Sequence, residues 1–184
     1  MKKIAFIYGG IAGAIIISVM TLGLVVSEGE GASSSEAFGY LTMLIVLSMI
    51  FVGVKKYRDQ DLGGVIKFGP AFGLGVAIAS VAGLFYVMGW EFYLAATDHA
   101  FIDDYTAGVI ESKRAAGMAG ADLNKLIADM EAMKKTYANP LFRMPMTFLE
   151  IFPVGLVVAL FSAALLRNPK ILPSRGPTTL ERPQ

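Results

Sequence analysis

The chain has 184 residues, of which 55% are hydrophobic and 17% charged, and its mean hydropathy is +0.59. A water-soluble domain carries about 25% charged residues, so this composition indicates a membrane protein in contact with a lipid bilayer. The net charge of +1 gives no basis for binding nucleic acid. Cysteine is absent and His99 is the single histidine, which excludes disulfides and a thiolate or histidine-rich metal centre. We therefore expect no cofactor.

Four apolar stretches are long enough to cross a membrane, because a hydrocarbon core of about 30 Å needs about 20 apolar residues in a helix. In chain order they cover residues 4–26, 38–54, 68–94 and 141–166. The first could also be a cleaved signal peptide, since Lys2 and Lys3 precede it. Its apolar run exceeds the roughly 7–15 residues of a signal core, and no small-residue cleavage site follows, so we expect a retained helix.

Basic residues are concentrated on one predicted side of the membrane. This side carries Lys2, Lys3, Lys55, Lys56, Arg58, Lys67, Arg167, Lys170, Arg175 and Arg182, against the acids Asp59, Asp61 and Glu181. The first loop on the other side carries Glu28, Glu30 and Glu36. Lysine and arginine in short loops mark the cytoplasmic side, so we predict that both termini are cytoplasmic.

The segment 98–138, between the third and fourth stretches, shows apolar residues at helical spacing in two runs. The runs are Phe101, Ile102, Tyr105 and Val109, then Leu123, Leu126, Ile127, Met130, Met133 and Tyr137. Gly117 and Gly120 separate them, and Pro140 ends the second because proline disfavours helix in the residue before it. We predict a helical hairpin on the outer side, with its apolar stripes on the partner helix or the membrane surface.

These elements predict an all-α polytopic protein, a four-helix bundle over residues 1–167 with a disordered cytoplasmic tail at 168–184. The tail is polar and rich in proline. Small residues recur at four-residue spacing, which permits close helix contacts. They are Gly9 and Gly13, then Gly69, Gly73 and Ala77, then Gly75, Ala79 and Gly83, and finally Gly155, Ala159 and Ala163. Packing within the bundle is the favoured interpretation, and a homo-oligomer through one ridge is the alternative.

Three ionisable residues in the predicted spans form the candidate polar site, because charges inside membranes are costly. They are Glu91 and Glu150, with Arg143 as the expected partner of Glu150, two turns away on one helix face. A structural role is favoured over a proton or ion pathway, since only Thr42, Ser48, Ser80 and Ser162 could continue a polar path toward the cytoplasm. Pro153 should kink the fourth helix next to Glu150.

Two further clusters have simple explanations. Asp98, His99 and Asp103 could bind a divalent cation, but a solvated helix-capping cluster is favoured because no second histidine or cysteine completes a ligand set. The basic run Lys55–Arg58 should set the topology and could touch anionic lipid. No phosphate-binding loop, Gly-x-Ser-x-Gly or His-Glu-x-x-His motif occurs, so we expect no enzymatic activity.

Three stretches resemble a membrane family known as domain of unknown function 4199 (DUF4199). They are Ser48–Asp59, Leu62–Phe72 and Asn139–Gly155, of which the last is the most specific. With the helix order, the resemblance covers about residues 1–167. It implies a bacterial inner-membrane protein and supplies no activity.

The leading functional hypothesis is a non-enzymatic accessory or scaffold membrane protein whose outer hairpin binds a partner. The alternative is a small transporter or proton/ion channel that uses Glu91 and Glu150. A membrane enzyme would require a polar cavity converging on Glu150, Arg143 and Glu91.

Overall fold

The computed structural model describes residues 1–26 and 35–174, and this part of the chain is entirely helical apart from turns and loops. The helices are α1 (Lys2–Val26), α2 (Ser35–Leu47), α3 (Met49–Asp61), α4 (Phe68–Ala96), α5 (Ala100–Ala115), α6 (Gly120–Tyr137) and α7 (Pro140–Leu166). Four stretches are long and apolar enough to span a membrane, namely Lys2–Gly23, Gly39–Asp61, Phe68–Ala96 and Pro140–Leu166. The predicted all-α fold with four membrane-spanning helices is confirmed.

The second span is longer than predicted, because α2 and α3 form a nearly continuous helix to Asp61 with a one-residue interruption at Ser48. The prediction that this span ends near Val54 and that the basic run Lys55–Arg58 lies in a loop is therefore wrong. Lys55 and Asp59, which are four residues apart, form an ion pair on one face of the helix. This pair stabilises the additional helical turns.

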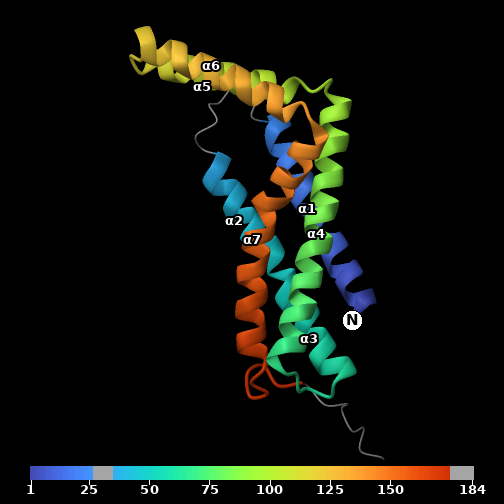
Figure 1. The fold of residues 1–184 in the computed structure, drawn as a ribbon. Coiled ribbons are helices and arrows are strands. Elements are labelled where there is room, and N and C mark those ends of the chain that lie inside the picture. Colours follow the sequence, from blue (N-terminus) through green and yellow to red (C-terminus); the bar gives the residue numbers. More distant parts are fainter. Residues whose placement is uncertain (27–34, 175–184) are drawn as a thin grey trace, which may run out of the picture.

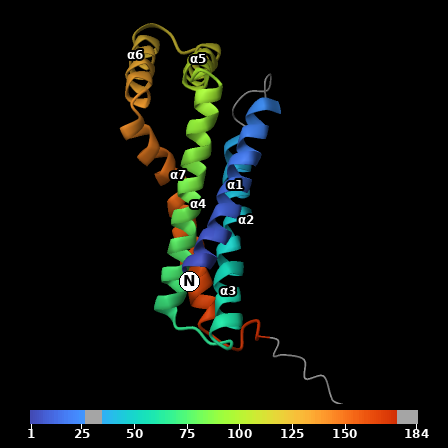
Figure 2. The same cartoon turned by 90° about the vertical axis from the view of Figure 1, so that its right-hand side faces the viewer.

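The long helix α4 forms the centre of the bundle, with α1 on one side and α7 on the other (Figures 1 and 2). Gly9 and Gly13 of α1 lie so close to α4 that a β-carbon on Gly13 would fall 2.6 Å from the Ala82 carbonyl oxygen. On the α7 side, a β-carbon on Gly75 would lie 2.8 Å from Cβ of Ala159. These ridges are therefore used within the chain, where missing side chains allow close backbone contact.

The surface of the spans is strongly apolar. Phe92 is 77% exposed and Leu141 is 85% exposed, and large apolar side chains of α1, α2, α4 and α7 are exposed alongside them. A water-soluble protein rarely leaves so much contiguous apolar surface uncovered. The outside of the bundle is thus a surface suited to lipid.

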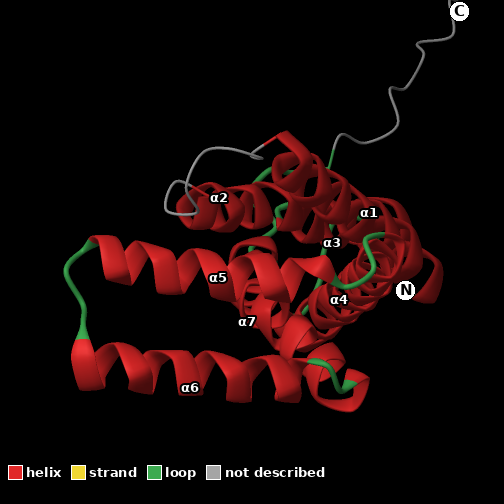
Figure 3. Ribbon diagram, turned by 90° about the horizontal axis from the view of Figure 1, so that it is seen from above, coloured by secondary structure: helices red, strands yellow, loops and turns green. Residues whose placement is uncertain are grey.

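Helices α5 and α6 run antiparallel and extend sideways from one end of the bundle, across its long axis (Figures 1 and 3). We call residues Ala100–Tyr137 the arm. Its apolar stripes are largely shielded, and Tyr105, at 42% exposure, is the arm's one exposed large apolar residue. Lys134 of α6 and Asp103 of α5 form an ion pair of 2.6 Å across the two helices. The outer location of the arm stays a prediction.

Candidate functional site

Arg143 and Glu91 form the most buried ion pair at the arm end of the bundle. Arg143 lies in the first turns of α7 and is 2% exposed. Its Nε donates to Glu91 Oε1 at 2.7 Å and its Nη2 donates to Glu91 Oε2 at 2.5 Å. This two-point geometry matches the planar guanidinium to the carboxylate and fixes α7 against α4. The candidate residues Glu91 and Arg143 thus meet.

Tyr137, the last residue of α6, joins the arm to this ion pair. Its backbone carbonyl accepts a 3.1 Å hydrogen bond from Arg143 Nη1, and its ring lies 5.6 Å from the guanidinium carbon. Its hydroxyl oxygen accepts a 2.8 Å bond from Trp90 Nε1. Burial raises the pKa of the Tyr137 phenol above its usual range. Trp90 also packs edge-to-face on Phe101 of α5, with ring centroids 4.8 Å apart.

Glu150 lies apart from this cluster. Seven residues of α7 separate it from Arg143, which is about 10 Å along the helix axis. Its Oε2 is 3.5 Å from the hydroxyl of the buried Tyr86, and that hydroxyl is 2.9 Å from Met20 Sδ of α1. The predicted Arg143–Glu150 partnership is therefore wrong, because the cross-helix carboxylate of Glu91 offers Arg143 a two-point contact.

Three serine hydroxyls on the expected polar path are bonded within their own helices. Ser48, Ser80 and Ser162 each donate to a backbone carbonyl three or four residues earlier, at 2.5, 2.9 and 2.7 Å. This local bonding satisfies a hydroxyl in an apolar setting. These three serines therefore do not link Glu150 to the opposite end of the bundle.

A cleft of about 430 Å³ opens where the arm joins the bundle. We call it the arm-base cleft; it is lined by Leu94, Asp98, His99, Ile102, Asp103, Lys134, Tyr137, Ala138 and Arg143. The Asp103 carboxylate bonds to Lys134 and raises the pKa of that ammonium group. Asp98 and His99 are present, but no three His, Cys, Asp or Glu side chains of the described residues are grouped to hold a metal ion.

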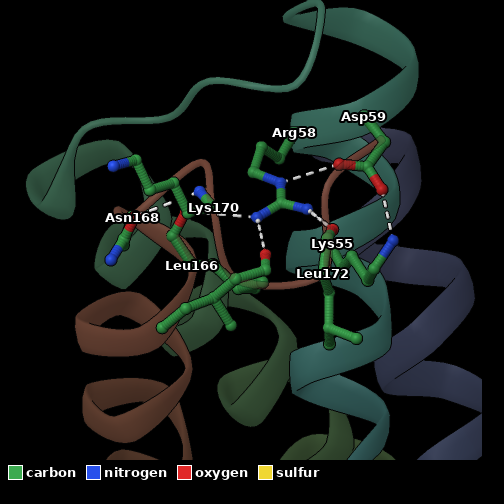
Figure 4. Close-up of polar contacts among 8 residues, drawn as sticks. Lys55, Arg58, Asp59, Leu166, Asn168, Lys170 and Leu172 are labelled. Atoms are coloured by element: carbon green, nitrogen blue, oxygen red, sulfur yellow. Dashed lines mark hydrogen bonds and ion pairs between the residues drawn. The ribbon is translucent and has the colours of Figure 1, made fainter. Parts of the chain in front are cut away.

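A second polar cluster, at the other end of the bundle, centres on Arg58 of α3, which is 0% exposed (Figure 4). Its Nε bonds to Asp59 at 2.7 Å, Nη1 bonds to the Ile171 carbonyl at 3.0 Å, and Nη2 bonds to the Leu172 carbonyl at 2.5 Å. Nη1 also lies 3.5 Å from the carbonyl of Leu166, the last residue of α7. A cation is favourable at a helix C-terminus, where carbonyls lack partners.

This cluster corrects two predictions. Arg58 is not a solvated charge available to lipid, because its guanidinium is enclosed by protein. Residues 168–172, assigned to a disordered tail, fold back as turns against α3; the tail from 175 onward lies outside the described residues. The acceptors are backbone carbonyls more than 100 positions away along the chain, so no side-chain pattern could have indicated this role.

The fold and its polar clusters define an all-helical protein with four candidate membrane spans, whose ends are fastened by Arg143 and Arg58. Residues 7–168 match the family described as a protein of unknown function (DUF4199), and the chain belongs to this family. The expected resemblance is thereby confirmed. No curated protein and no solved structure matches the chain significantly.

Proposed function

We propose that this protein is a non-enzymatic accessory or scaffold protein of a bacterial inner membrane, and that its arm binds a partner on the outer side. The observation that carries the proposal is the arm itself. It projects beyond the spans, encloses most of its own apolar surface and presents mainly charged and alanine residues outward. Fastened at its base by Tyr137, it offers a prepositioned recognition surface.

A rigid base makes the arm suited to recognition, because ordering costs reduce affinity. Tyr137 connects the arm to both α4 and α7 through Trp90 and Arg143. By contrast, the rival ion-pathway function has weaker support. Glu91 is already neutralised by Arg143, and Glu150 lacks a continuing chain of free hydroxyls among the described serines.

Orientation can be measured directly because the chain contains no cysteine. Ser112→Cys on the arm and Gln60→Cys at the opposite end both place a thiol at an exposed position. A membrane-impermeant maleimide added to intact cells should label Ser112→Cys, whereas labelling of Gln60→Cys should require permeabilised cells. The reverse pattern would reject the outer location of the arm.

Partner binding is tested by photo-crosslinking from Ala128 of α6, which is exposed on the arm. Gln60 serves as the matched position at the opposite end. The proposal expects a discrete adduct from the Ala128 position that is absent from the Gln60 position. A monomer without an adduct from any exposed arm position, in intact membranes, would count against the scaffold function.

The rival function has a separate test in sealed liposomes loaded with a pH-sensitive or ion-sensitive dye. The scaffold proposal expects no flux above that of empty liposomes, and Glu150→Gln should behave like the wild-type protein. Flux that disappears in Glu150→Gln would favour a transporter or channel.

A further inference from the structure

The arm-base cleft has the size of a small-ligand site. Its volume of about 430 Å³ lies within the range of known ligand pockets. Leu94, near the end of α4, forms part of its wall, and Arg143, in the first turns of α7, forms another. The cleft therefore sits where two spans emerge from the apolar zone.

The cleft contains hydrogen-bond donors with unused capacity. An arginine side chain carries five N–H groups, and Arg143 uses three of them in bonds to Glu91 and Tyr137. An ammonium group carries three N–H groups, and Lys134 bonds to Asp103 at 2.6 Å and makes a longer ion pair of 3.9 Å with Glu131. Lys134, whose side chain is 32% exposed, can therefore still donate to an anionic ligand group, whereas Arg143, at 2% exposure, contributes only its positive charge to the wall of the cleft.

An acceptor lies in the same cleft. Asp98 is exposed, and its side chain makes no hydrogen bond or ion pair with any other described residue. Its backbone is left-handed, with φ of 50°, as is that of His99, with φ of 60°. This turn places Asp98 between the end of α4 and the start of α5. A carboxylate without a partner thus faces a ligand-sized space that also contains two cationic side chains.

The surroundings of the cleft indicate a lipid source for such a ligand. Trp90 and Tyr93 stack near the end of α4, and Tyr137 lines the cleft; tryptophan and tyrosine are typical of the membrane–water interface. Leu141 and Phe142, directly before Arg143, are 85% and 51% exposed. Apolar surface suited to acyl chains therefore adjoins polar groups suited to a head group.

We propose that the arm-base cleft binds the zwitterionic head group of an aminophospholipid such as phosphatidylethanolamine. Its phosphodiester accepts a hydrogen bond from Lys134, close to the buried positive charge of Arg143, and its primary ammonium group donates to Asp98. Phosphatidylcholine lacks N–H groups on its quaternary nitrogen and cannot make the second set of bonds. The site is independent of whether the arm's outward surface binds a protein partner.

Trp90 provides the assay, because it is the only tryptophan and it bonds to Tyr137 at the cleft. The full-length protein is placed in phosphatidylcholine nanodiscs that contain a small fraction of either brominated phosphatidylethanolamine or brominated phosphatidylcholine. Bromine quenches tryptophan fluorescence at short range, so the extent of quenching reports local lipid occupancy. Ion pairs at partly exposed sites strengthen binding by up to about fivefold, which sets the expected preference for phosphatidylethanolamine.

Two variants remove the proposed contacts. Asp98→Asn keeps a residue that tolerates the left-handed backbone, and Lys134→Gln removes an ammonium group in an exposed ion pair. Asp98→Asn should lose most of the preference, and Lys134→Gln should weaken quenching by both brominated lipids. Asp129→Asn on the exposed part of α6 should change neither. Circular dichroism checks that each variant keeps its helices. The proposal would be overturned by equal quenching by the two lipids in the wild-type protein, by an unchanged preference in Asp98→Asn, or by unchanged quenching by both lipids in Lys134→Gln.

A final measurement distinguishes a membrane lipid from a soluble ligand with the same head group. Glycerophosphoethanolamine is added to the protein in pure phosphatidylcholine nanodiscs. The lipid proposal expects at most weak changes in Trp90 emission from this soluble head group, because it lacks the acyl chains. Strong binding of the soluble compound, together with no preference between the brominated lipids, would overturn the lipid source.

Discussion

Replacing Arg143 by methionine tests whether the ion pair with Glu91 fastens the arm end of the bundle. The change keeps an unbranched side chain but removes the two bonds to Glu91 and the bond to the Tyr137 carbonyl. It also leaves Glu91, whose side chain is 20% exposed, without its cationic partner. Removing one member of a buried ion pair costs about 3–5 kcal/mol of unfolding free energy.

Glu91→Gln should cost less, about 1.5–3 kcal/mol, because the amide oxygen still accepts one bond from the guanidinium. The double variant should cost less than the sum of the two single variants, since it leaves no unpaired buried charge. We expect a coupling free energy of about 1–3 kcal/mol for residues in direct contact. Reversible unfolding in mixed micelles, followed by circular dichroism, provides all three values.

The matched control is Glu150→Gln, which lies on the same helix but does not contact Arg143 in the structure. Its effect should add to that of Arg143→Met to within about 0.5 kcal/mol, as for independent sites. Additivity of Glu91→Gln with Arg143→Met, combined with coupling between Glu150→Gln and Arg143→Met, would refute the pairing described here.

Three further outcomes follow from specific contacts. Arg58→Met should release the turns after α7 and accelerate tryptic cleavage after Lys170, because two carbonyl contacts with this segment are lost. Gly13→Ala should reduce the unfolding free energy by about 1–3 kcal/mol through overpacking, whereas Gly73→Ala, with open space around it, should raise it by about 0.5–1 kcal/mol. Burial raises the pKa of Tyr137, so the folded state favours the neutral phenol. The free energy of unfolding should therefore fall as the pH rises above about 10, where the phenol of the unfolded chain ionises. Tyr137→Phe should make this fall shallower.

Each of these outcomes has its own control or contrary result. For Arg58, the control Lys56→Met at an exposed neighbouring position should leave the cleavage rate unchanged. Equal cleavage rates in the Arg58 and Lys56 variants would show that Arg58 does not hold the turns after α7. For the glycines, equal effects of the two alanine substitutions would contradict the close α1–α4 contact. For Tyr137, parallel pH–stability curves of the wild-type protein and Tyr137→Phe would show that the phenol does not titrate differently on folding.

The chain's composition and local periodicity determined the class of fold. Apolar runs of sufficient length specify membrane helices on their own, because each backbone bond is satisfied within the segment. The DUF4199 family was likewise recognisable from contiguous stretches of residues, and residues 7–168 match it. The Gly9–Gly13 spacing indicated close helix packing, although the identity of α4 as its partner required the three-dimensional arrangement.

The partners of the ionisable residues were decided only by tertiary structure. Sequence spacing favoured Glu150 as the partner of Arg143, since the two share a helix face, but the carboxylate of Glu91 from α4 lies within hydrogen-bond distance at two points. Arg58 was expected in a loop, yet backbone carbonyls beyond the end of α7 enclose it. Every residue has a backbone carbonyl, so the acceptors of Arg58 could not be recognised in the sequence. Spacing along one helix does not show that a residue on another helix, such as Glu91, competes for Arg143. The sequence therefore determined the helices, because they depend on neighbouring residues. Only packing decided the contacts that hold the helices together, because these depend on groups that are distant along the chain.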